Sequence, residues 1–183
     1  MKLKTCFLLL LLTIGRLSAQ APQQLQSDVK KLYVAFDEID IDKLSVMLLS
    51  TDEPAKVYDK LDSYFLNDEQ KFRYVYTNVK YNFGPIQEID GKSYCSINFR
   101  NVVRITYFKP IDVASVQGML KVKFNTESVV YEKARNSFMI VYNAKMIASQ
   151  TGGIWQFAFA DDTLPKEISG DIVPENAKKA LGL

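Results

Sequence analysis

The chain has no histidine, and this limits the chemistry that its other reactive side chains could carry out. Histidine is the commonest general base and the commonest metal ligand, so its absence excludes Ser-His-Asp and Cys-His nucleophiles. Cys95, Ile97 and Phe99 occupy alternate positions and are separated by polar residues, which places them on the apolar face of a predicted strand. This position predicts a buried core thiol and not a nucleophile, which would need an adjacent base.

Acidic residues are the remaining candidates for proton transfer or for metal binding. Four of them lie between residues 37 and 42, but the segment lacks the central glycine and terminal glutamate of an EF-hand loop. A proton-transfer enzyme needs a carboxylate whose pKa is raised by burial in an apolar pocket. Glu88 and Glu127 lie in the strand-rich region, but both are next to turn signals. We therefore expect no catalytic residue, no metal and no cofactor.

Aromatic side chains on the predicted strands are the remaining candidates for a binding site. A curved sheet could bring several of them to one concavity, where tyrosine hydroxyls would orient a largely apolar ligand. The candidate ligand-binding residues are Tyr74, Tyr76, Phe99, Tyr107, Tyr142, Trp155 and Phe157. For each of them, membership of an ordinary hydrophobic core is the alternative.

The elements that would position these residues begin with short helices. Val29, Leu32, Tyr33 and Phe36 recur at helical spacing after a cap at Ser27 or Asp28. A second helical phase includes Leu44, Met47 and Leu48. A third begins at Pro54 and carries Val57, Leu61, Tyr64 and Phe65 on one face. Two or three short helices are therefore expected to open the domain.

From Lys71 to about Asp161 the apolar period changes from 3.6 to 2, which predicts strands. Asp90-Gly91 and the loop 150–153 are predicted hairpin turns. Asn101 lies on the apolar side of its strand and predicts a bulge or bend. Leu120, Val122 and Phe124 alternate with lysines and predict a further strand, and Pro174 could start a short helix.

The N-terminal segment has the layout of a secretory signal. Lys2 and Lys4 precede the apolar run 7–12, and the segment ends in Leu17-Ser18-Ala19. The run is shorter than the roughly 20 residues that a membrane-spanning helix needs. We expect residues 1–19 to be a cleaved signal peptide, with a retained anchor as the alternative, followed by a polar leader at 20–26 and a single domain at 27–183. The mature product would then be periplasmic or extracellular, with no stable membrane anchor.

Charge and cysteine content bound the partners of the mature chain. Three of the 23 basic residues lie in the signal, which leaves 20 basic residues against 21 acidic ones. This balance gives no electrostatic signature of a nucleic-acid-binding protein, and the sequence shows no Lys/Arg cluster of the kind that docks on anionic lipid. We therefore expect the chain to bind neither nucleic acid nor an anionic membrane surface. Cys6 also lies in the signal, so Cys95 would have no partner for a disulfide and stability would come from packing.

Helices followed by hairpin-connected strands are typical of an α+β domain. Residues 31–36, followed by Asp40, Asp42 and Leu44, resemble the opening helix pair of the NTF2-like (SnoaL-like, cystatin-like) superfamily. Residues 145–148 and the stretch from Gly152 to Phe157, which includes Trp155, are similar to its closing hairpin. One departure is the segment 83–92, which predicts a turn where family members often have a short helix.

The resemblance implies helices packed on a strongly curved antiparallel sheet, a cone with an apolar pocket at its open end. A small β-barrel with flanking helices is the structural alternative. The superfamily includes both enzymes and noncatalytic binders, so the fold does not select the function. From the residues we expect a noncatalytic binding or interaction domain, with a small apolar ligand in the pocket and a homodimer through the sheet face. The alternative is a small His-free isomerase or dehydratase acting on an apolar substrate.

Overall fold

A computed structural model describes residues 21–75, 78–160, 164 and 172–183. The predicted signal peptide, together with Tyr76, lies outside these described residues. Three helices open the described part of the chain, as predicted: α2 (Gln23–Glu38), α3 (Ile41–Met47) and α4 (Pro54–Phe65). Helix α2 begins four residues before Ser27, within the segment expected to be a polar leader, because Leu25 extends its buried stripe by one turn.

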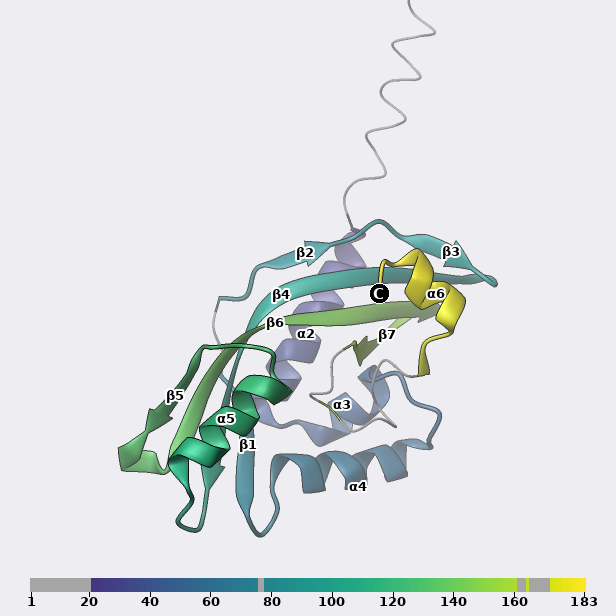
Figure 1. Ribbon diagram of the computed structural model, residues 1–183. Coiled ribbons are helices and arrows are strands. Elements are labelled where there is room, and N and C mark those ends of the chain that lie inside the picture. Colours follow the sequence, from purple (N-terminus) through teal and green to yellow (C-terminus); the bar gives the residue numbers. More distant parts are fainter. Residues whose placement is uncertain (1–20, 76–77, 161–163, 165–171) are drawn as a thin grey trace, which may run out of the picture.

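Within the described residues, seven strands form one antiparallel sheet (Figure 1). The strands are β1 (Gln70–Tyr74), β2 (Tyr81–Phe83), β3 (Gln87–Ile89), β4 (Lys92–Tyr107), β5 (Val129–Glu132), β6 (Ser137–Thr151) and β7 (Ile154–Phe159). The order β1-β4-β6-β5 forms the main path, with β2 and β3 also paired to β4 and β7 paired to β6. The long strands β4 and β6 therefore hold the sheet together. Helices followed by a curved antiparallel sheet confirm the predicted α+β class.

The bulge or bend predicted at Asn101 is absent from the ladder between β4 and β6, but a change of register occurs at this position on the other side of β4. The register of β4 with β6 runs unbroken from Ser93↔Gln150 to Thr106↔Ser137. On the other side of β4, the register changes between Tyr74↔Val103 and Tyr81↔Phe99. The chain between β1 and β2 is therefore three residues longer than the stretch of β4 beside it. Figure 1 shows that β4 and β6 curve together.

Glycine-containing turns close both predicted hairpins. Asp90 and Gly91 have φ values of 50° and 74° between β3 and β4. Gly152 and Gly153 have φ values of 60° and 84° between β6 and β7. Two positive φ angles in a two-residue loop match the right-handed twist of the strands. In the segment 83–92 the turn at Asp90-Gly91 was predicted, whereas the short strand β3 that precedes it was not.

The strand predicted at Leu120–Phe124 is wrong, because this stretch belongs to helix α5 (Val113–Lys123) and its C-cap. The Asp112 carboxylate caps the helix by accepting from the backbone N–H groups of Ala114 and Ser115. Leu120 and Phe124 are four residues apart, so both reach the core, whereas Val122 is 83% exposed. An alternation of five residues is too short to distinguish the strand period of 2 from the helical period of 3.6. The Asp112 cap, which favours the helix, lies outside it.

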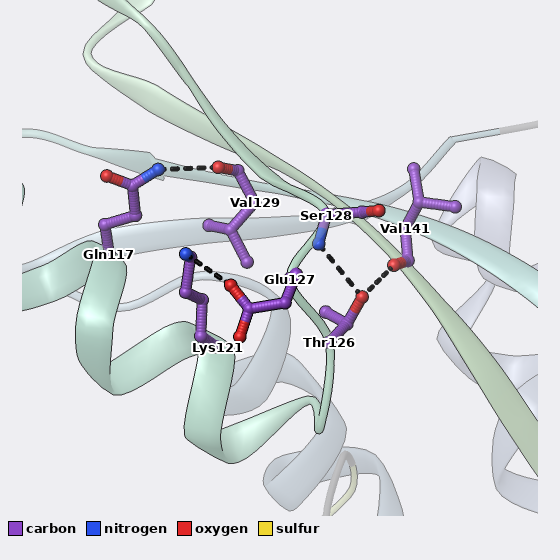
Figure 2. A network of polar contacts seen from close by, with 7 residues as sticks. All are labelled: Gln117, Lys121, Thr126, Glu127, Ser128, Val129 and Val141. Atoms are coloured by element: carbon purple, nitrogen blue, oxygen red, sulfur yellow. Dashed lines mark hydrogen bonds and ion pairs between the residues drawn. The ribbon is translucent and has the colours of Figure 1, made fainter.

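Polar contacts attach α5 to the neighbouring strands (Figure 2). The Gln117 side chain donates to the Val129 carbonyl at 2.7 Å, and Lys121 pairs with Glu127 at 2.6 Å. The Thr126 hydroxyl donates to the Val141 carbonyl at 2.7 Å and accepts from the Ser128 N–H at 3.1 Å. These contacts hold the end of α5 against β5 and β6. Glu127 is 88% exposed and pairs with Lys121, so it lacks the burial that a catalytic carboxylate would need.

The two faces of the sheet have different coverings. The inner face, which carries Ile97, Phe99 and Val103 of β4, packs with the opening helices in the main hydrophobic core. On the outer face, Tyr94 and Ile147 pack with Ala177 of α6 (Glu175–Ala180), the helix predicted after Pro174. Figure 1 shows α6 near the end of the sheet where β3 lies, away from β1 and β5.

Candidate functional site

The structure brings six of the seven predicted ligand-binding aromatics to the inner face. Tyr74, Phe99, Tyr142, Trp155 and Phe157 are buried in the main core, and Tyr107 is packed against it. The rings of Tyr74, Phe99, Tyr107 and Tyr142 pack against other aromatic rings of the core. The ring centroids of Tyr74 and Phe36 are 4.4 Å apart, and those of Tyr142 and Phe124 are 5.0 Å apart. Their part in ligand binding stays a prediction, because these contacts also suit a packed core.

A hydrogen-bonded chain of three side chains crosses this core, and Asn101 is its centre. The Tyr33 hydroxyl donates to the Asn101 side-chain oxygen at 3.0 Å, and the Asn101 amide donates to the Tyr142 hydroxyl at 2.8 Å. Asn101 and Tyr142 are direct cross-strand partners, while Tyr33 comes from α2. All three are buried. The position of Asn101 on the apolar side of its strand is the sequence signal of these hydrogen bonds.

The buried thiol and the paired carboxylates show what acid–base chemistry the described residues offer. Burial raises the pKa of Cys95 to about 11, so the thiol is protonated at neutral pH. A hydrogen bond from Lys43 lowers the pKa of Asp40, and one from Lys60 lowers that of Asp52. Hydrogen bonds from Arg104 and Ser137 lower the pKa of Glu132. Among the described residues, no carboxylate belongs to the buried class.

A largely apolar hollow lies on the solvent side of α2, where α3 packs beside it. Its volume is about 380 Å³, and its lining consists of Ser27, Lys30, Lys31, Val34, Ala35, Lys43 and Met47. Val34 falls on the side of α2 opposite the buried stripe and is 41% exposed. Lys31 is paired with Asp28 at 2.9 Å, and Lys43 is paired with Asp40. The lysines therefore form a charged rim around an apolar floor.

Sequence reasoning missed this hollow, although one signal pointed to it. Val34 interrupts the polar face of an amphipathic helix, and a single exposed valine needs no special explanation. The spacing of apolar residues along α2 does not predict where α3 packs, and this packing brings Met47 into the same hollow as Val34. Within the described residues, no group of three or more Cys, Asp or Glu side chains could hold a metal ion. None of the described helices is long and apolar enough to cross a membrane.

Comparisons with known proteins give a likeness in shape and no match in sequence. No family model and no curated protein matches the sequence. Among solved structures, the chain is similar to the 1.8 Å structure of Aln2 from a Streptomyces species, with 10% sequence identity and a TM-score of 0.36. The match covers 78% of this chain and 94% of Aln2.

Proposed function

We propose that this chain is a noncatalytic binding domain for a small apolar ligand. The observation that carries the proposal is the apolar hollow between α2 and α3, with Val34 and Met47 in its lining. Its volume of about 380 Å³ is in the range of small-molecule sites, roughly 300–1,000 Å³. A ligand that covers this exposed apolar lining gains about 25 cal/mol of binding free energy for each Å² of apolar area that it removes from water.

This location differs from the one suggested by the resemblance to NTF2-like proteins. That resemblance puts the ligand on the inner face of the curved sheet, against residues such as Phe99 and Trp155. Of the described candidate aromatics, none lines the hollow between α2 and α3. We favour this hollow because its apolar surface is open to solvent, whereas five of the candidate aromatics are buried by one another and by the helices.

The alternative function is a small His-free isomerase or dehydratase. Such an enzyme needs a carboxylate that gains a proton at neutral pH, and burial is the usual cause. The pKa values of Asp40, Asp52 and Glu132 are all lowered, because each carboxylate accepts a hydrogen bond from a lysine or arginine. This electrostatic arrangement keeps the three groups ionised and favours binding over proton transfer.

Export and self-association complete the proposal. The N-terminal signal pattern supports secretion to a periplasm or to the medium, where Cys95 needs no disulfide partner because it is buried. A homodimer through the sheet face remains part of the proposal, since the outer faces of β4, β5 and β6 carry half-buried and exposed apolar side chains, including Val130.

Native mass spectrometry of the protein, purified gently from its own host, tests this function. We expect a small-molecule mass on the folded chain that disappears on denaturation, and the same spectrum reports the oligomeric state. The mass of the intact chain will show whether residues 1–19 have been removed. A folded protein that carries no additional mass, even after incubation with a lipid extract of its host, would oppose the small-ligand proposal.

A further inference from the structure

A second hollow, on the outer face of the sheet beside β1 and β4, is lined by cationic side chains. Its volume is about 460 Å³, and Lys71, Arg73, Arg104 and Arg135 all contribute to its lining. Lys71 and Arg73 come from β1 and Arg104 from β4, and all three are half-buried. Arg135 comes from the 3-10 turn between β5 and β6. Residues from four segments of the chain, including Asp37 of α2, therefore converge on this one place.

The cross-strand register places two of these cations directly opposite each other. Arg73 and Arg104 are Cα partners in the antiparallel pair of β1 and β4, so their side chains leave the same face of the sheet. Like charges in this position destabilise a sheet when nothing lies between them. Glu132 offsets part of the charge of Arg104, and an anion bound in the hollow would add an attraction to both arginines.

One carboxylate beside the hollow holds Arg104 in place without neutralising the whole site. Glu132 accepts from the Arg104 Nε at 2.8 Å and from its Nη2 at 3.4 Å, and it also accepts from the Ser137 hydroxyl at 2.9 Å. The guanidinium has five N–H donors, so this pairing leaves others for a ligand. Within the described residues, Lys71, Arg73 and Arg135 make no ion pair.

The charge count gives the class of ligand. Four cations surround the hollow, and Asp37 and Glu132 are the carboxylates that line it or pair with its arginines. Two positive charges are therefore left unmatched. Arginine recognises phosphate and carboxylate groups through paired N–H donors, and Thr106 adds a hydroxyl to the lining. We propose that this hollow is a binding site for a dianionic phosphate group, carried by a small molecule or by a lipid headgroup.

A second copy of the chain fits this part of the sheet less well than a phosphate does. A twofold dimer centred on this hollow would bring the four cations of one copy close to those of the other, so the homodimer proposed above would be centred on the apolar side chains around Val130 and not here. The lysines and arginines that suit an anion would then repel. The phosphate site is also distinct from the apolar hollow between α2 and α3, because no residue lines both.

Calorimetric titration with inorganic phosphate in a low-salt chloride buffer tests the site. The variants are Arg73→Gln and Arg135→Gln inside the hollow, with Arg100→Gln as the matched control, because Arg100 is an exposed arginine of β4 outside that lining. All three remove one positive charge. We expect Arg73→Gln to weaken phosphate binding about tenfold, the effect of one charge-assisted hydrogen bond, and Arg135→Gln to weaken it in the same direction. Arg100→Gln should change it less than about twofold.

Flotation with vesicles identifies the source of the phosphate group. Co-flotation with vesicles that contain phosphatidic acid, lost in Arg73→Gln, would indicate a lipid headgroup, whereas binding of free phosphate without flotation would indicate a soluble ligand. Either result supports the site. The proposal is overturned if the wild-type chain does not bind phosphate, or if Arg73→Gln and Arg100→Gln weaken binding equally. The apolar-ligand proposal is tested separately, because Arg73→Gln leaves the hollow at α2 and α3 unchanged.

Discussion

Asn101 shows how one polar side chain can join two elements inside an apolar core. Its oxygen accepts from Tyr33 of α2 and its amide donates to Tyr142 of β6, so it connects the long helix to the central strands. A buried amide is costly unless its hydrogen bonds are made, and a chain of such bonds specifies one arrangement of the core. We infer that Asn101 sets the position of α2 against the sheet.

Replacing Asn101 tests this role. Asn101→Ala leaves two buried tyrosine hydroxyls without their asparagine partner and opens a small cavity, so we expect the free energy of unfolding to fall by about 2 to 4 kcal/mol. The control is Asn98→Ala, an exposed position on the same strand, which should change it by no more than about 0.5 kcal/mol. Urea denaturation followed by circular dichroism measures both values. Equal small losses in the two variants would contradict the inference.

Cys95 gives a prediction about pH. Burial raises its pKa from the ordinary 9.0 to about 11, and the protonated Sγ–H donates to the Gly84 carbonyl at 3.3 Å. A group whose pKa is higher in the folded state contributes stability that is complete below the unfolded pKa and is lost as pH rises toward the folded value. The free energy of unfolding should therefore fall between about pH 9 and pH 11 more steeply than in Cys95→Ala, which lacks the thiol.

The same property predicts low thiol reactivity in the folded state. At pH 8, a pKa of about 11 leaves roughly one thiol in a thousand ionised, and access to the reagent is blocked as well. A thiol-specific reagent should label Cys95 slowly in buffer and rapidly in denaturant. Labelling at the same rate in both conditions would show that the residue is exposed.

At the scale of elements, turn residues predicted the hairpins well because their backbone requirement is local. Asp90-Gly91 and Gly152-Gly153 have the positive φ angles that two-residue loops need, and few other residue pairs adopt them readily. The helix α5 was predicted as a strand because Leu120, Val122 and Phe124 fit a period of 2 over only five residues. The residues that distinguish the two structures lie outside that window, at Asp112 and in the partners of Thr126.

Two substitutions separate the helix from the predicted strand. In a strand, Leu120 and Val122 would both face the core, whereas in α5 Leu120 is 1% exposed and Val122 is 83% exposed. Leu120→Ala should therefore lower the free energy of unfolding by about 2 to 5 kcal/mol, because it opens a cavity in the core. Val122→Ala should change it by about 0.5 kcal/mol or less. Chemical denaturation gives both numbers, and a large loss in Val122→Ala would favour the strand.

At the scale of the whole molecule, the sheet separates surfaces of different character. The inner face is filled by aromatic and aliphatic side chains, while hollows lie on the solvent side of α2 and on the outer face of the sheet. The aromatic residues of the inner face could be predicted from strand alternation. The hollows could not, because each combines residues from separate elements: Val34 with Met47 in one, and Arg73 with Arg135 in the other. Their proximity depends on packing between elements, which no local period records.

The central claim is that the apolar ligand occupies the hollow between α2 and α3. Val34→Asp puts a carboxylate on its apolar floor, one helical turn from Lys30 and Lys31, so the helix should remain folded. Val46→Asp is the matched control, because Val46 is a 57% exposed valine of α3 outside the lining and follows Lys43 by three residues.

Native mass spectrometry of these two variants and the wild-type chain, each produced in the native host, is the most direct test. The account predicts a ligand mass on the wild-type chain and on Val46→Asp, and little or none on Val34→Asp, since burying a carboxylate against an apolar ligand is costly. A ligand mass retained equally by all three folded chains would contradict the account and would favour a ligand site on the inner face of the sheet.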